Sequence, residues 1–180
     1  MEEKTIPVWD PFVRVFHWSL VICVGTAWLS SNDAKTLHTV VGYIASGLVI
    51  SRVIWGFVGS KYARFSQFVH SPRIVIRYMK SIVSHREVRY LGHNPAGGSM
   101  IIALILAVFA TCISGWMLTT DAFWGVLWVQ KVHGFAARGI LLMVLFHVIG
   151  VLVASVRHRE NLPLAMFSGH KRRPGPVDVV

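Results

Sequence analysis

The chain has 180 residues, of which 54% are hydrophobic and 14% are charged, and its mean hydropathy is +0.56. This composition is too apolar for an ordinary soluble domain, and it predicts a single integral membrane domain over residues 1–180. The formal net charge of +10 would suit a nucleic acid partner. Because 12 of the 18 basic residues fall in two segments that fit a membrane topology, we expect no nucleic acid partner.

Four apolar stretches are each long enough to cross a hydrocarbon core of about 30 Å, which takes about 20 helical residues. Asp10-Pro11 and Asn94-Pro95 precede the first and third stretches, as helix-start signals do. The first stretch lacks the basic start of a secretory signal, so we interpret it as a retained span. The expected fold is an all-α membrane protein, a four-transmembrane-helix bundle with spans near 12–30, 37–58, 98–119 and 131–156.

Basic residues cluster in the connection 59–97 and in the tail after the fourth span. Against one acid, Glu87, the connection carries Lys61, Arg64, Arg73, Arg77, Lys80, Arg86 and Arg89. The tail carries Arg157, Arg159, Lys171, Arg172 and Arg173. The other two connections hold almost no positive charge, which is the positive-inside pattern. We therefore expect both termini and residues 59–97 to be cytoplasmic in a bacterial inner membrane, with basic side chains meeting anionic membrane lipid.

The long connection contains a segment with helical periodicity that opens at Ser71-Pro72. Its apolar residues recur on one face and its basic residues share the other, namely Val75, Met79, Ile82 and Val83 against Arg73, Arg77 and Lys80. This pattern predicts a basic amphipathic helix. Two interpretations are open: a helix on the cytoplasmic membrane surface, or a short helix that caps the bundle.

Four histidines lie within the predicted spans: His17, His38, His133 and His147. Imidazole is costly at membrane depth and usually has a function there. His133 and His147 are 14 residues apart, close to four helical turns, so they share a helix face at levels about 21 Å apart. With a cytoplasmic N-terminus, depth pairs His17 with His147 at the inner level and His38 with His133 at the outer level.

Two facing imidazoles in a helix bundle are natural axial ligands for a haem iron. The expected cofactors are therefore two bis-histidine b haems, with the four histidines as iron ligands. Zinc is a poor alternative because it usually takes four ligands. Cys23 and Cys112 lie in spans and no Cys-x-x-Cys-His occurs, so covalent haem attachment is not expected. A histidine-bearing metal or proton transporter is the non-redox alternative.

Several further residues are placed to support the haems. Arg52 follows His38 by 14 residues, and Arg14 precedes His17 by about one turn, so either arginine could pair with a propionate of the inner haem or extend to lipid headgroups. Lys131 and Arg138 are weaker candidates at the outer haem. Small residues in the spans either admit the porphyrin or let helices approach, namely Gly42, Gly47, Gly134 and Gly139.

Almost the whole chain resembles the small four-helix bacterial cytochrome b561 family, close to the b-type cytochrome subunits of nickel-iron hydrogenases. The first half carries the segments VWDPFVRVFHW, LHTVVGY and SRVIWGFVGSKYARFSQF. The second half carries RYLGHNPAGG, KVHGFAARGILLMVLFHVIGVL and RHRENLPLAMFSGHKR. A series of segments in this order is more specific than four histidines alone.

The resemblance implies two non-covalent b haems on His17, His38, His133 and His147. It also implies electron exchange between the membrane quinone pool, ubiquinone or menaquinone, and a partner such as a periplasmic c-type cytochrome or a dehydrogenase subunit. A homodimer is possible. The alternative activity is a superoxide oxidase that passes electrons to ubiquinone, which requires a cationic approach to the outer haem by Lys35, Lys131 and Arg138. No catalytic side chain is expected in an electron carrier.

Overall fold

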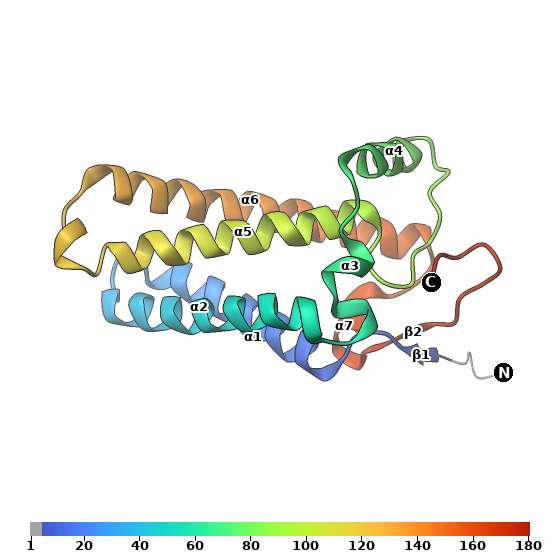
Figure 1. Ribbon diagram of the computed structural model, residues 1–180, viewed down its shortest axis with the longest axis horizontal. Coiled ribbons are helices and arrows are strands. Elements are labelled where there is room, and N and C mark those ends of the chain that lie inside the picture. The colour runs from blue at the N-terminus through green and yellow to red at the C-terminus, as the bar shows by residue number, and fades with distance from the viewer. Residues whose placement is uncertain (1–4) are drawn as a thin grey trace. The chain divides into compact units, whose positions relative to one another are not determined.

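The structure, a computed structural model, describes residues 5–180 and is dominated by four long helices (Figure 1). These are α1 (Pro11–Ser30), α2 (Lys35–Val58), α5 (Pro95–Met117) and α6 (Leu127–Arg157). All four are long and apolar enough to cross a membrane, which confirms the predicted four-helix membrane fold. The remaining elements are short: β1 (Thr5–Pro7), η1 (Lys61–Ala63), α3 (Phe65–Phe68), α4 (Pro72–Val83), η2 (Asp121–Phe123), α7 (Leu162–Ser168) and β2 (His170–Arg172).

The described chain forms two compact units, and each long helix contributes to both. We call Val15–Val53 with Ala103–Val144 the spanning unit. The terminal unit comprises residues 5–14, 54–102 and 145–180. Both ends of the described chain and the long connection after α2 therefore belong to the terminal unit, as expected if they lie on one side of a membrane. Their assignment to the cytoplasmic side remains a prediction from charge.

The spanning unit has a small apolar core to which all four long helices contribute. Val49 of α2, Val108 of α5 and Ile140 of α6 form its buried centre. Leu20 and Val24 of α1 pack against them. Much of the remaining apolar surface of these helices is exposed in the protein itself, as expected for side chains whose solvent is lipid.

The terminal unit is held together by elements that come from distant parts of the sequence. β1 and β2 pair antiparallel, with Thr5 opposite Arg172. This two-stranded sheet is an addition to the all-α fold expected from the sequence, which gives no signal for such short strands. Beside it lies an apolar core of Val8, Trp9, Leu91 and Ala165.

Both helix starts that the sequence predicts are formed. The backbone N–H of Val13 donates to Oδ1 of Asp10 over 2.8 Å, which caps α1. The N–H of Gly97 donates to Oδ1 of Asn94 over 2.7 Å in the first turn of α5. Asp10 also accepts hydrogen bonds from Trp55 and Ser60, so one carboxylate joins the start of α1 to the chain that leaves α2.

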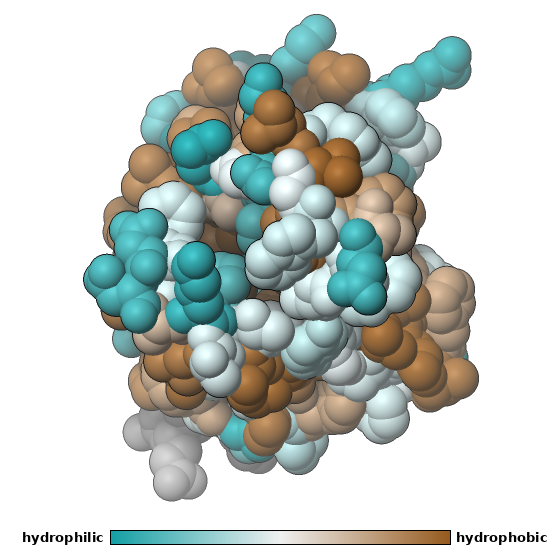
Figure 2. Space-filling view, turned by 90° about the vertical axis from the view of Figure 1, so that its left-hand side faces the viewer, coloured by the Kyte–Doolittle hydropathy of each residue, from teal (hydrophilic) through white to brown (hydrophobic). Residues whose placement is uncertain are grey.

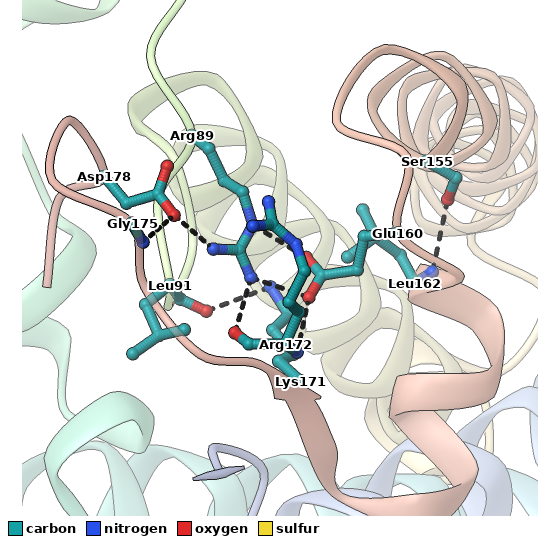
Figure 3. Close-up of polar contacts among 9 residues, drawn as sticks. All are labelled: Arg89, Leu91, Ser155, Glu160, Leu162, Lys171, Arg172, Gly175 and Asp178. Carbon is teal, nitrogen blue, oxygen red and sulfur yellow. Dashed lines mark hydrogen bonds and ion pairs between the residues drawn. The ribbon is translucent and has the colours of Figure 1, made fainter. Parts of the chain in front are cut away.

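A network of buried charges links the connection before α5 to the C-terminal tail (Figure 3). Arg89 forms ion pairs with Glu160 at 2.7 Å and with Asp178 at 2.5 Å, and all three side chains are buried. Burial raises the pKa of Glu160 and of Asp178, but hydrogen bonds and the Arg89 charge lower both pKa values overall. The described tail is thereby fixed to the rest of the terminal unit.

Lys171 is the second buried cation of this network. Its Nζ donates to the carbonyl of Leu91 over 2.9 Å and lies 5.2 Å from the ring centre of Trp9. Burial lowers the pKa of Lys171 to about 8, against the charge of Glu160, which raises it. The expectation that the basic residues of these segments meet lipid is therefore wrong for Arg89 and Lys171, because protein groups enclose both.

Candidate functional site

The spanning unit brings together two of the four histidines, His38 near the start of α2 and His133 in the second turn of α6. The centres of their rings are 6.0 Å apart, and the ring planes are inclined by 74°. Both side chains are half-buried. This is the pair that the depth argument assigns to the outer level.

Each of these rings is oriented by a hydrogen bond at Nδ1. Nδ1 of His38 lies 2.8 Å from the carbonyl oxygen of Ala27 on α1. Nδ1 of His133 lies 3.0 Å from the carbonyl oxygen of Thr111 and 3.2 Å from Oγ of Ser114, both on α5. A carbonyl can only accept, so in both rings Nδ1 carries the proton and Nε2 has a free electron pair.

This is the tautomer that an imidazole needs if it is to ligate a metal through Nε2. Ligating histidines usually donate their second ring nitrogen to a carbonyl or carboxylate, which fixes the ring and increases its basicity. Within residues 5–180, neither Nε2 atom makes a hydrogen bond. The two Nε2 atoms are therefore available to a ligand.

The separation of the two rings also fits one metal ion between them. Two metal–imidazole bonds of about 2 Å each, together with the radii of the two rings, amount to about 6 Å between ring centres. No group of three or more His, Cys, Asp or Glu side chains in residues 5–180 is arranged to hold a metal ion. An iron already held by a porphyrin needs only two axial ligands from the protein, which this pair can supply.

Two glycines shape the surroundings of the pair. A Cβ atom at Gly115 would lie 3.0 Å from Cε1 of His133, so glycine lets this ring approach α5 closely. Gly42 lies one turn after His38 on the same helix face, where an added Cβ would meet no described atom within 4 Å. Open space beside the ligand face of α2 is what a porphyrin edge requires.

The other glycines singled out in the sequence differ from one another. An added Cβ at Gly47 or Gly139 also meets no described atom within 4 Å, whereas one at Gly134 lies 3.5 Å from Nη2 of Arg138 on the same helix. Close helix approach therefore does not account for Gly42, Gly47 or Gly139. At Gly134, an added Cβ would make only an ordinary contact with the Arg138 guanidinium, so close approach does not account for this glycine either.

The end of the spanning unit near the pair carries the connections from α1 to α2 and from α5 to α6. Figure 2 looks onto this end and shows hydrophilic and intermediate residues over much of its middle, with hydrophobic residues largely around the margin. An open hollow of about 770 Å³ lies along the start of α2, lined by Asn32–Leu37 and Val40. Its lining includes the residue that precedes His38, so solvent can reach this part of α2.

The remaining predicted site residues are distributed over both units. His17 lies on α1 in the spanning unit, 4.9 Å from the ring of Trp18, whereas His147 is half-buried on α6 in the terminal unit. Their pairing remains a prediction from helix register. Arg52 is buried in the spanning unit, with 3% of its surface exposed. A role for Arg52 at a propionate also remains a prediction.

Arg14, Lys131 and Arg138 have different surroundings. The Arg14 guanidinium donates to the carbonyl of Phe167 over 2.6 Å and so caps the C-terminal end of α7 within the terminal unit. Lys131 and Arg138 are exposed on α6. A guanidinium has five N–H donors, so the bond from Arg14 leaves others for a second acceptor.

Comparison with known proteins identifies the family of the chain. Residues 8–169 match the family described as prokaryotic cytochrome b561. The chain belongs to the prokaryotic cytochrome b561 family. It is therefore a multi-pass membrane protein and a b-type cytochrome of electron transfer, and the family implies haem b as its cofactor.

Two relatives of this b561-family cytochrome have the same description, a probable Ni/Fe-hydrogenase B-type cytochrome subunit. The protein from Bradyrhizobium diazoefficiens is 22% identical, with 94% of this chain and 87% of the relative aligned. The protein from Rhizobium leguminosarum bv. viciae is 20% identical, with 95% of this chain and 90% of the relative aligned. The resemblance found in the sequence segments is thus confirmed over nearly the whole chain.

Sequence reasoning missed the groups that orient the two rings. Ser114 and the carbonyls of Ala27 and Thr111 are the partners of His38 and His133. Every residue has a backbone carbonyl, so no residue type marks the two that accept these hydrogen bonds. Ser114-Gly115, a small polar residue and a glycine in the third span, was the one available signal.

Proposed function

We propose that this cytochrome holds two b haems and carries single electrons across the bacterial inner membrane, between the quinone pool and a redox partner at the other face. When bound, each haem iron accepts and releases one electron without a change of ligands. The protein supplies fixed axial imidazoles, an apolar surrounding and a route through four spans. Electron transfer between the two haems needs no side chain that acts as a catalytic acid, base or nucleophile.

The observation that carries this proposal is the His38–His133 pair. Two imidazoles from different helices lie 6.0 Å apart, and each has its Nδ1 proton directed to a carbonyl. Burial of two polar rings in apolar helices costs free energy unless they have partners. A haem iron between the two Nε2 atoms would satisfy both, and an apolar macrocycle would fill the open space beside Gly42.

For the inner haem, we propose His17 and His147 as ligands on the basis of helix register. His133 and His147 are 14 residues apart on α6, so they share a helix face. Arg52 and Arg14 are the proposed propionate partners, Arg52 because it is a buried cation and Arg14 because it lies one turn before His17. A quinone site at this level would connect the haems to the membrane pool.

For the partner at the outer face, we propose a small redox protein such as a c-type cytochrome, or a dehydrogenase subunit. The alignment with the Bradyrhizobium diazoefficiens relative extends over 217 positions, whereas this chain has 180 residues, so that relative contains insertions. The connection from α5 to α6 is brief, residues 118–126, which suits a compact cytochrome that a separate partner visits. The open hollow along the start of α2 gives such a partner access close to His38.

Superoxide oxidation is the alternative activity, and the charges at this end of the spanning unit weigh against it. Superoxide is an anion, which a net positive surface would attract. Lys35, Lys131 and Arg138 are accompanied there by Asp33 and Asp121, so the net formal charge of these five residues is only +1. We therefore expect faster haem reduction by a reduced c-type cytochrome than by superoxide in a stopped-flow comparison. The opposite order would favour the oxidase.

Haem content measures the proposed ligation directly. We expect a purified protein with two haems per chain and sharp b-type bands in the reduced-minus-oxidised spectrum. His133→Ala and His38→Ala should each remove one haem, and the double variant should lose no more than either alone, because both ligands serve the same iron. His170→Ala is the matched control, since His170 is exposed on β2.

Three results would contradict the proposal. Unchanged haem content in both single variants would refute the outer pair. Loss of both haems in the double variant, with the helical content retained, would show that the two residues ligate different irons. A purified protein without b-type bands would end the cytochrome proposal altogether.

A further inference from the structure

Helix α4 has an exposed apolar strip that no described part of the protein covers. Its inner side is anchored by Tyr78, which is buried and donates to the carbonyl of Val88 over 3.3 Å. Ile76, Met79 and Val83 lie on a different side of the helix and are 54%, 55% and 81% exposed. These three residues follow the i, i+3, i+7 spacing of one helix face. A helix on the surface of a soluble protein would rarely expose such an apolar strip to water.

A row of basic side chains borders this strip. Arg73, Arg77 and Lys80 are all exposed, and their spacing places them together on the adjacent side of α4. Helix α4 contains no acidic residue, and none occurs between Ala34 and Arg86. Three cations beside three apolar side chains are typical of a helix that lies at the surface of an anionic membrane.

The structure also places α4 at the point where a spanning helix ends. Arg157, the last residue of α6, donates through Nη1 to the carbonyl of Ile82 over 2.6 Å. The same nitrogen pairs with Glu87 at 2.7 Å. The last turn of α4 is thereby bonded to the end of a transmembrane helix, where lipid headgroups are the nearest surroundings.

We infer that α4 lies on the membrane surface, against the anionic headgroup layer. Ile76, Met79 and Val83 are then inserted among the upper acyl chains. Arg73, Arg77 and Lys80 would then contact lipid phosphates, because cations near an anionic surface lower the free energy of association. Of the two interpretations that the sequence leaves open, the exposed apolar strip favours the membrane surface over a bundle cap. This inference depends on the membrane fold and not on the haems.

Single-cysteine labelling in reconstituted protein tests this inference. Val83→Cys lies on the strip, whereas Ile74→Cys, also exposed, lies on the opposite side of the helix and is the matched control. A charged, membrane-impermeant maleimide should modify Ile74→Cys in phosphatidylglycerol bilayers at least roughly tenfold faster than Val83→Cys, since the strip lies below the headgroups. Cys23 and Cys112 give the background, measured in the unsubstituted protein.

The basic row supplies the second arm of the test. In the background of Arg73→Gln, Arg77→Gln and Lys80→Gln, the protection of Val83→Cys should largely disappear, because three cations together favour surface binding by on the order of a hundredfold. Phosphatidylcholine bilayers should likewise remove the protection of Val83→Cys when Arg73, Arg77 and Lys80 are unchanged. Equal modification of the two cysteines in phosphatidylglycerol would overturn the proposal. Protection that survives both charge removals would overturn it as well, since the strip would then be covered without any contribution from an anionic surface.

Discussion

Two polar clusters, one in each unit, satisfy their hydrogen-bonding groups in different ways. In the terminal unit, Arg89, Glu160 and Asp178 satisfy one another, so the charged network is complete within the described chain. In the spanning unit, His38 and His133 use Nδ1 to bind the protein and leave Nε2 for something else. The contrast shows that a completed network serves stability, whereas a half-satisfied pair indicates a ligand.

Arg89→Met is expected to have the largest effect, and it should affect folding and not cofactor content. Its removal leaves Glu160 and Asp178 buried without their cation, which typically costs about 3–5 kcal/mol. Hydrogen exchange of the backbone amides in residues 160–178 should report this loss as faster opening of the tail. The b-type bands of the outer haem should remain.

Arg86→Met is the control for this substitution, because Arg86 is exposed on the same connection and forms none of the network's ion pairs. Comparable exchange rates in the two variants would mean that the network contributes nothing to the stability of the tail. The interpretation of the Arg89 network as a stabilising feature of the terminal unit would then be wrong.

Gly42→Leu tests the proposed ligand site of the spanning unit. It should affect cofactor content and not folding. Leucine favours a helix interior over glycine, and the space beside Gly42 is open in the protein alone. In the haem-bound protein, the added side chain should crowd the macrocycle and weaken binding of the outer haem by roughly tenfold to a hundredfold, as overpacking by about 1–3 kcal/mol does. Haem titration of the purified apoprotein measures this change.

Gly47→Leu is the matched control, since Gly47 is also open but lies on the opposite face of α2 from His38. Its haem affinity should equal that of the unsubstituted protein. If both leucine variants bound the outer haem normally, the open space at Gly42 would have no connection with the cofactor.

The smallest expected effect is a pH dependence of the terminal unit that arises from Lys171. Burial lowers the pKa of Lys171 to about 8, below its ordinary value of 10.5. Between these values the unfolded chain binds more protons than the folded protein, so the free energy of unfolding rises with pH across this window. A rise on the order of 1 kcal/mol is expected in denaturant titrations followed by hydrogen exchange of the tail.

Lys171→Met should abolish this rise, because it removes the titrating group while keeping an apolar stem of similar length against Trp9. A rise of the same size in both proteins would assign it to another group. The spectrum of the outer haem, held in the spanning unit, should stay constant over the same pH range.

Much of the fold follows from the sequence because it depends on local or additive properties. Length and hydropathy predict the four spans, since burial in lipid is a sum over consecutive residues. Asp10 and Asn94 predict helix starts because a cap acts within one turn. The observed helix boundaries differ little from the predicted ones. For example, α6 begins at Leu127 and not at 131, so Leu127 and the exposed Trp128 lengthen the helix at its N-terminal end.

For the site, the sequence by itself determined the helix register of the histidines, because the period of an α-helix is fixed. Only the tertiary structure decided that the rings of His38 and His133 lie 6.0 Å apart with Nδ1 directed to carbonyls, since those carbonyls belong to other helices. It also showed that Arg89 and Lys171, read from composition as lipid-facing cations, are enclosed by protein. Arg89 is 71 residues from Glu160 and 89 from Asp178, and contacts over such separations depend on the path of the folded chain.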